Sequence, residues 1–273
     1  MAVLLKSALL FLLACGAVIG AVHPSSPQAI KERGYLRVAV YDNEPPFGYV
    51  DGHGNYDGFD IRFAKRLAKE LLGDENLIRY TVLINQEERV QMLLDDIVDV
   101  VFASFTVTSK RAKEVDFANP YMKTAIGVVS PEDAHITNLK QLRDKKLIVY
   151  SDTTADLFFR RNYPEIALLR YARHEEAFGA LLEGRGAALA QDTTLLVAWA
   201  QKHKGFKVGM TMLGNAQLIA PAVKKGNDEL REWINATFER MGEEQFALKT
   251  FNEILKPYYG DIGKEMIVEG GKP

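Results

Sequence analysis

VDVVFASFTVTSKRAKEVDFANPY, residues 98–121, is the most informative stretch of this sequence for both fold and function. Its first six residues, Val98–Ala103, form an apolar run that is typical of a buried strand in a parallel sheet. Small hydroxyl residues then occupy alternate positions, at Ser104, Thr106 and Thr108. Arg111 follows at a place where we expect the first turn of a helix.

The position of Arg111 indicates an anion site. An arginine is normally disfavoured in the first turn of a helix, because the helix N-terminus carries the positive end of the helix dipole. Its presence there suggests that an anion binds between the guanidinium, the strand-end hydroxyls and free backbone N–H groups. A carboxylate suits an arginine, whose planar fork makes two parallel hydrogen bonds. The alternative is a solvated arginine beside capping hydroxyls, and the spacing alone leaves both open.

The same stretch resembles the motif of bacterial extracellular solute-binding proteins for polar amino acids, which serve ABC importers. Their pattern is a small or hydroxyl residue, x, Thr, x, Thr, two residues and Arg, followed by an acidic-Phe-x-x-Pro-Tyr run. The matching residues here are Ser104, Thr106, Thr108, Arg111, Asp116-Phe117 and Pro120-Tyr121. The resemblance extends over about residues 30–260. It implies an α/β fold of two lobes, the type II periplasmic-binding-protein fold, with a ligand cleft between lobes that each hold a mostly parallel sheet flanked by helices.

The composition is that of an ordinary soluble globular chain. Beyond a leader, roughly 255 residues remain, enough for one large or two small domains. The formal net charge is −2, so nothing indicates a nucleic-acid partner. Five scattered histidines and a single cysteine have no zinc-site spacing. We therefore expect neither a metal ion nor a cofactor.

Residues 1–22 are predicted to be a signal peptide, because one lysine precedes an apolar core too short and too lightly flanked for a membrane span. The only cysteine, Cys15, lies in a Leu-Leu-Ala-Cys-Gly run that resembles a lipobox. It would be lipidated and become the mature N-terminus; the alternative is an ordinary leader cut near Ala21. Residues 23–29, HPSSPQA, are expected to be a tether with little to bury. These features favour the periplasm or cell envelope, with a lipid anchor as the only membrane contact.

Strand and helix patterns alternate, and the alternation restarts in the second half of the chain. Strands are predicted at residues 35–41, 81–84, 98–103, 146–150, 168–171 and 187–190, with an extended segment at 218–223. Helices are predicted at residues 59–72, 88–95, 153–162, 175–183 and 193–203, and a last helical region at 228–255. This order favours parallel sheets with helices on both faces.

The resemblance assigns these pieces to two lobes. Residues 26–120 plus 221–273 would form lobe 1, and residues 126–215 would form lobe 2. Hinge strands near 121–125 and 216–220 would join them. The ligand would lie where loops leave the carboxyl ends of both sheets, and closure of a hinge around a ligand is established for periplasmic binding proteins.

A free amino acid carries a carboxylate and an ammonium on one carbon, so a protein that recognises it needs an anion clamp and a cation acceptor. The clamp would be Arg111 with the backbone N–H groups and hydroxyls of Ser104 and Thr106. Thr153 and Thr154 would add free N–H groups, because they follow a strand and open a helix.

Two features of the second loop leave its role open. Thr153 and Asp156 have the spacing of a capping box, which is compatible with ligand binding because caps and ligands share one turn. The family usually has glycine where this chain has Asp152, so the backbone shape is uncertain there and a negative charge is added.

Asp192 is the expected acceptor for the ligand ammonium. It follows the predicted strand at 187–190 and precedes a helix at Thr193, where the family places an aspartate with this role. The alternative is a helix N-cap, a position that aspartate commonly occupies.

The side-chain pocket would be formed by two loops. The first loop, YDNEPPF, contributes Tyr41, Asn43, Glu44 and Phe47, and the third contributes Arg89. Arginine at position 89 resembles both the family members that take acidic amino acids and the cysteine binders. A solvated helix face is the alternative for it. Glu44 could neutralise Arg89 across the cleft, and Asp152 would repel an acidic ligand if it faces inward.

We therefore expect a monomeric amino-acid-binding protein that delivers its ligand to the membrane subunits of an ABC permease and performs no chemistry. Cysteine is the expected ligand, because four segments resemble the cysteine-binding surface lipoproteins of the family: residues 45–51, 153–156, 219–226 and 269–272. Aspartate or glutamate is the alternative ligand. An enzyme on the same fold, of the cyclohexadienyl dehydratase type, is the alternative of another class, with Glu44 as its only candidate acid.

Overall fold

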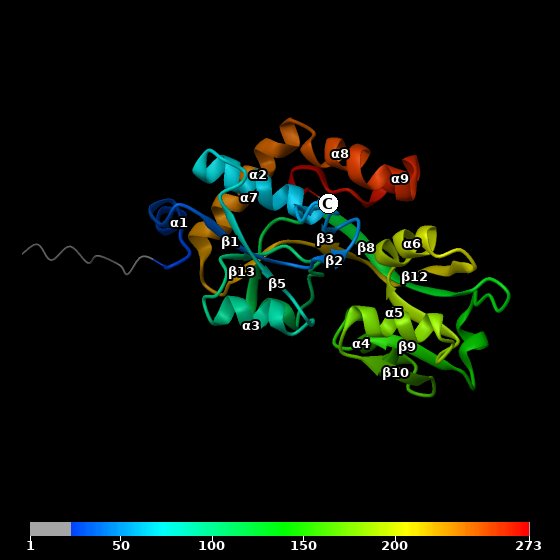
Figure 1. The fold of residues 1–273 in the computed structure, drawn as a ribbon. Helices are drawn as coiled ribbons and strands as arrows, with labels where there is room; N and C mark the ends of the chain where they lie inside the picture. Colours follow the sequence, from blue (N-terminus) through cyan, green and yellow to red (C-terminus); the bar gives the residue numbers. More distant parts are fainter. Residues whose placement is uncertain (1–22, 273) are drawn as a thin grey trace, which may run out of the picture.

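The computed structural model describes residues 23–272, which form two α/β lobes (Figure 1). The sheet of lobe 1 has the strand order β5-β1-β6-β13-β7. Its strands are β1 (Leu36–Val40), β5 (Ile78–Val82), β6 (Val100–Val101), β7 (Val115–Phe117) and β13 (Ala222–Lys224). Strand β1 runs parallel to β5 and β6, whereas β13 runs antiparallel to β6 and β7.

The sheet of lobe 2 repeats this topology, in the order β10-β9-β11-β8-β12. Its strands are β8 (Met122–Pro131), β9 (Lys146–Tyr150), β10 (Ala167–Tyr171), β11 (Ala188–Asp192) and β12 (Phe206–Ile219). Strand β9 is parallel to β10 and β11, and β8 is antiparallel to β11 and β12. The predicted α/β fold is thus observed, and the sheets are mixed because one strand in each returns antiparallel.

Helices cover both faces of the lobe 1 sheet. Helix α2 (Phe59–Leu72) and helix α7 (Asp228–Glu243) bury Phe59, Phe63 and Phe238 in a large apolar core on one face. Helix α3 (Glu88–Leu94) closes a smaller core on the other face. Helix α2 follows the predicted apolar stripe and ends at Gly73, whose positive φ of 86° glycine adopts without strain.

Lobe 2 has the same layering. Helix α4 (Thr154–Asn162) packs Phe159 into the core on one face, and helices α5 (His174–Leu182) and α6 (Thr193–Lys202) pack Phe178 and Leu196 into the core on the other. Strands β8 and β12 pair along their length from Met122 opposite Ile219 to Pro131 opposite Phe206. They extend from lobe 1 into lobe 2 (Figure 1), and the hinge near their lobe 1 ends stays a prediction.

Short elements complete the chain. They are α1 (Pro27–Arg33), the hairpin strands β2 (Asn43–Glu44), β3 (Gly48–Val50) and β4 (Tyr56–Asp57), the 3₁₀ turns η1 (Arg111–Lys113), η2 (Leu139–Leu142), η4 (Asp261–Met266) and η5 (Glu269–Gly271), the helices α8 (Phe246–Thr250) and α9 (Lys256–Tyr259), and the π-helical turn η3 (Phe251–Leu255). Gln245, with a left-handed φ of 54°, interrupts the predicted helical region at 228–255. The Tyr259 hydroxyl donates to the Thr194 carbonyl, so the C-terminal helices of lobe 1 also contact lobe 2.

The predicted tether at residues 23–29 is wrong. Ser25 and Ser26 are buried, and the Ser26 hydroxyl accepts the Ala29 N–H at 3.1 Å as the N-cap of α1. The signal peptide, Cys15 and the lipobox lie outside the described residues. Within residues 23–272, no helix combines the length and the apolar character that a membrane crossing needs.

Asp99 explains why the segment before α1 is folded. Its carboxylate, 0% exposed, accepts hydrogen bonds from the Ser25 hydroxyl at 2.6 Å and the Arg37 N–H at 2.8 Å. The guanidinium groups of Arg33 and Arg37 both pair with it. One buried charge therefore joins the N-terminal segment, α1 and β1 to the turn before β6.

We predict that Asp99→Ala lowers the free energy of unfolding by about 3 kcal/mol, because it leaves two neighbouring guanidinium groups without their counter-charge. Urea denaturation measures this loss. The control is Glu244→Ala, which removes a 2.7 Å ion pair with Arg66 from an exposed site and should cost less than about 1 kcal/mol. Equal losses in the two variants would contradict the role of Asp99.

Candidate ligand-binding site

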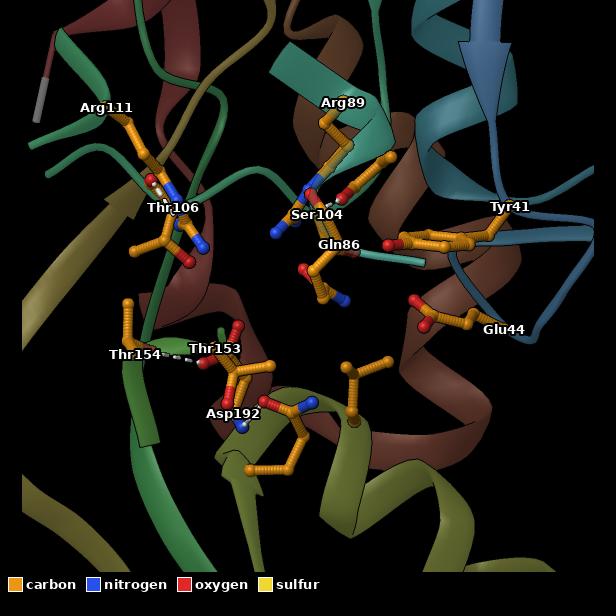
Figure 2. Close-up of a pocket in the computed structure, with 13 residues that line it drawn as sticks. Tyr41, Glu44, Gln86, Arg89, Ser104, Thr106, Arg111, Thr153, Thr154 and Asp192 are labelled. Carbon is orange, nitrogen blue, oxygen red and sulfur yellow. Dashed lines mark hydrogen bonds between the residues drawn. The ribbon is translucent and has the colours of Figure 1, made fainter. Parts of the chain in front are cut away.

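A small chamber lies between the lobes, lined by both (Figure 2). Nine of the eleven predicted binding residues line it: Tyr41, Glu44, Arg89, Ser104, Thr106, Arg111, Thr153, Thr154 and Asp192. Its volume is about 10 Å³, about the room that one water molecule needs. An amino acid therefore enters only if the surrounding groups move apart.

The loop after β6 forms the lobe 1 side of the chamber. Thr106 makes an antiparallel bridge with Ile219, in which the hydrogen bonds run from the N–H groups of Val107 and Ala220. Within residues 23–272, this bridge leaves the Thr106 N–H without an acceptor. Ser104 differs from the prediction, because its N–H is bonded to the Asp60 carboxylate at 2.8 Å. Thr106, not Ser104, thus has a backbone donor free for an anion.

Arg111 joins the two lobes. Its guanidinium donates to the Thr106 carbonyl at 2.8 Å in lobe 1 and to the Asp152 carbonyl at 3.3 Å in lobe 2. It lies in the 3₁₀ turn η1 rather than in the longer helix that the sequence suggested. Burial, together with the neighbouring Arg89, lowers the pKa of Arg111 to about 9. An anion in the chamber would relieve both unfavourable effects.

Phe105 supports both guanidinium groups. Its ring, fully buried, lies 4.4 Å from the Arg89 carbon Cζ and 4.9 Å from the Arg111 carbon Cζ, so each cation stacks on the same aromatic side chain. Arg89 is 3% exposed and donates to the carbonyls of Gln86 at 3.2 Å and Ala103 at 3.3 Å. The structure therefore places Arg89 in the chamber wall and not on a solvated helix face.

The N-terminus of α4 forms the lobe 2 side. The Thr153 hydroxyl accepts the Asp156 N–H at 3.2 Å and so caps the helix. The first-turn N–H of Thr154 has no intrahelical acceptor and opens on the chamber. Asp152, in the place of the usual glycine, keeps a left-handed φ of 62°. The capping interaction and the free donor thus coexist in one turn.

Asp192 lies at the end of β11, opposite Arg111 and Thr106 (Figure 2). Its side chain makes no capping hydrogen bond to α6, and it accepts the Thr154 hydroxyl at 3.4 Å instead. The carboxylate is 5% exposed, and burial raises its pKa to about 6 against the opposing effect of Arg111. The helix-cap interpretation therefore has no support, and the carboxylate is available to a cation.

Tyr41, Glu44, Arg89 and Gln86 form the remaining wall (Figure 2). Within residues 23–272, the Tyr41 hydroxyl and Arg89 Nη2 are buried without a hydrogen-bond partner. Buried polar groups are rarely left unpaired. This wall therefore suits a ligand with a small polar end.

Two predictions about charges in this wall are wrong. Glu44 does not pair with Arg89; its carboxylate lies 3.2 Å from Nδ1 of His174, in the other lobe. The Asp152 side chain does not face the chamber, because it is 41% exposed and lies 3.8 Å from the Arg170 guanidinium. Because the Asp152 side chain faces away, it repels an acidic ligand less than we expected from the sequence.

Two predicted binding residues are not in the chamber. Asn43 is exposed on β2, and Phe47 is buried in the large core of lobe 1. The sequence analysis in turn missed Gln191, whose side chain accepts the Asp192 N–H at 2.9 Å, and Leu195. Gln191 precedes Asp192 directly and Leu195 follows it by three residues. Their closeness to Asp192 in the sequence was the signal that could have predicted them. Within residues 23–272, no group of three metal-ligating side chains is placed to hold an ion.

The comparisons agree with this geometry. Residues 36–261 match the family of bacterial extracellular solute-binding proteins, family 3. The ABC transporter glutamine-binding protein GlnH of Bacillus subtilis is 31% identical over 78% of this chain and 78% of its own. The solute receptor for L-cysteine of Neisseria gonorrhoeae is 43% identical, with a TM-score of 0.86 over 89% of this chain and 100% of the receptor.

The cysteine-binding protein of Campylobacter jejuni is 46% identical, with a TM-score of 0.86 over 89% of this chain and 98% of that protein. These matches cover both lobes and nearly the full length of the solved structures, so they extend to the chamber and its walls. The chain belongs to the bacterial extracellular solute-binding proteins, family 3, and is the solute-binding component of an amino-acid ABC transporter.

Proposed function

We propose that this protein binds free L-cysteine between its lobes and delivers it, unchanged, to the permease. The observation that carries the proposal is the chamber itself, where anion donors from both lobes lie opposite the buried carboxylate of Asp192. That arrangement matches the carboxylate and ammonium of an α-amino acid. The two solved structures of about 45% identity are described as receptors for cysteine, which supports this choice of ligand.

Each charge of the ligand has a receptor. The carboxylate pairs with the Arg111 guanidinium and the N–H groups of Thr106 and Thr154, and it offsets the positive charge that Arg111 and Arg89 concentrate there. The ammonium pairs with Asp192. Lobe 1 supplies Arg111 and Thr106, and lobe 2 supplies Thr154 and Asp192. Binding therefore favours closure of the lobes about the predicted hinge at 121–125 and 216–220.

The wall of Tyr41, Glu44 and Arg89 receives the ligand side chain. A thiol is small, donates weakly and accepts weakly, so it can approach both Glu44 and Arg89. The side-chain carboxylate of aspartate or glutamate would face the buried carboxylate of Glu44, which is 2% exposed, and the two negative charges would repel each other. This repulsion remains even though the Asp152 side chain points away from the chamber.

The family is described as extracellular, which supports a location outside the cytoplasmic membrane. We further propose that Cys15 carries a lipid anchor and that the protein is a monomer. The support for the anchor is the lipobox-like run around Cys15. The support for a monomer is that the two lobes of one chain together line the chamber.

We predict that Arg111→Lys weakens binding roughly 30- to 4000-fold, because loss of a buried charged hydrogen-bond partner costs about 2–5 kcal/mol. Lysine keeps the charge but loses the fork that reaches Thr106 and Asp152. Titration calorimetry with L-cysteine measures the change. Arg143→Lys, the same substitution on an exposed residue, is the control and should leave the affinity unchanged. A change below tenfold in Arg111→Lys would remove Arg111 from the site.

Asp192 gives the binding a defined pH dependence. Its pKa is raised to about 6, and a ligand ammonium pairs only with the ionised form, so the affinity should be nearly constant between about pH 7 and pH 8 and fall by up to about tenfold per unit below pH 6. Asp192→Asn should bind all amino acids weakly, in unchanged order, and lose this slope. The pKa of Asp60 is also raised to about 6. Asp60 is present in both the wild-type protein and Asp192→Asn, so the difference between their two pH profiles reports Asp192. If Asp192→Asn lowers the melting temperature but binds amino acids normally, Asp192 acts only as the cap of helix α6.

A thermal-shift panel of the twenty amino acids under reducing conditions tests the ligand. Cysteine should give the largest rise in melting temperature, above serine, glutamine, aspartate and glutamate. A large shift with an acidic amino acid and none with cysteine would make Arg89 the reader of a side-chain carboxylate. Recovery of the bound amino acid by mass spectrometry should return it unchanged, and a converted product would instead establish an enzyme.

A further inference from the structure

The two lobes contain the same unusual feature at the chamber. In each, a non-glycine residue with a left-handed backbone lies at the start of a ligand-facing loop: Ser104 with φ 44° after β6, and Asp152 with φ 62° after β9. Side chains other than glycine rarely adopt this region without support from their surroundings. Something in each lobe must therefore hold the loop in place.

In lobe 1 the support is Asp60, in the first turn of α2. Its carboxylate, 1% exposed, accepts the Ser104 N–H at 2.8 Å through Oδ2, and the Ser104 hydroxyl lies 3.4 Å from the same oxygen. The other oxygen, Oδ1, accepts the Tyr121 hydroxyl at 2.7 Å. Tyr121 directly precedes β8, so Asp60 also connects the loop to the strand that runs between the lobes.

In lobe 2 the support is Asp156, in the first turn of α4. Its carboxylate, 0% exposed, accepts the Asp152 N–H at 3.0 Å. Arg170 holds the carboxylate with two hydrogen bonds, at 2.9 and 2.7 Å. Helices α2 and α4 differ in sequence and in length. In both, a buried aspartate in the first turn accepts a hydrogen bond from the N–H of a left-handed residue.

The two supported loops meet at Arg111. One hydrogen bond of its guanidinium goes to the carbonyl of Thr106, two residues after Ser104, and the other goes to the carbonyl of Asp152 itself. A change of backbone conformation at either left-handed residue would move a partner of the guanidinium. The geometry of the anion site thus depends on both aspartates, although neither lines the chamber.

We propose that Asp60 and Asp156 are positioning residues for the amino-acid site, each holding one left-handed loop so that the donors of the two lobes converge on the same carboxylate. This inference rests on the proposed function, because it assigns the two aspartates a part in amino-acid binding. Neither touches the ligand. Their contribution acts through the backbone of Ser104 and Asp152.

The test is a double-mutant cycle on affinity, with L-cysteine as the probe and titration calorimetry well below the melting temperature. Glycine adopts a left-handed φ without cost, so it removes the need for the supporting carboxylate. Asp60→Ala should weaken binding at least tenfold when introduced alone, and less than threefold when introduced into Ser104→Gly. The same cycle of Asp156→Ala with Asp152→Gly should give the same pattern.

Asp60→Asn is the matched control. Its amide oxygen still accepts the Ser104 N–H, and its NH₂ group can donate to the Tyr121 oxygen, so it should retain more of the affinity than Asp60→Ala. The Asp156 cycle stands as an independent arm if Asp60→Ala does not fold. A general loss of stability would lower the melting temperature in both backgrounds, but it would not be rescued by glycine at the left-handed position.

The outcomes distinguish a failure of the positioning role from a failure of the proposed amino-acid binding. Equal losses of affinity in the serine and glycine backgrounds, with wild-type protein binding cysteine normally, would overturn the positioning role alone. A wild-type protein that binds none of the twenty amino acids would overturn the proposed function, and the inference with it. Rescue in both cycles would establish the same positioning device in both lobes.

Discussion

The structure depends on one positive charge, the Arg111 guanidinium, that the two lobes share. Arg111 is bonded to a carbonyl of each lobe, and it stacks with Arg89 on the same buried Phe105 ring. Burial lowers the pKa of Arg111, and the neighbouring Arg89 guanidinium lowers it further. In the proposed function, the ligand carboxylate supplies the missing negative charge, so the binding energy and the closure of the lobes would have the same origin.

The repeated topology of the lobes explains why the protein groups that would bind the ligand converge on one place. In both sheets the parallel strands end at the cleft, and the following turns present a helix N-terminus, a strand-end carboxylate or a free backbone N–H to it. Neither lobe alone has a complete set. Lobe 1 supplies Arg111 and Thr106, and lobe 2 supplies Thr154 and Asp192. A site divided in this way binds a small ligand only when the lobes are together, which is the behaviour required of a component that must later release its ligand to a permease.

The parts of this site that were readable from the sequence are local. The run from Val98 to Arg111 places a strand, its hydroxyl residues and an arginine in one short segment, and Asp192 directly follows the strand that positions it. What could not be read depends on contacts distant in sequence. The Ser104 N–H is taken by Asp60, 44 residues earlier. Glu44 meets His174 only because the lobes face each other. Ser25 has the sequence context of a linker residue, but it is buried by its hydrogen bond to Asp99, 74 residues later.

The central claim is that the chamber recognises the two charges of a free α-amino acid at once. It is tested most directly by calorimetric titration with L-cysteine, its methyl ester and its N-acetyl derivative, compounds that share the thiol but lack one charge each. The account predicts that cysteine binds and that each derivative binds at least a hundredfold more weakly, because one leaves Arg111 and the other leaves Asp192 without its partner. Binding of either derivative within tenfold of cysteine would contradict it.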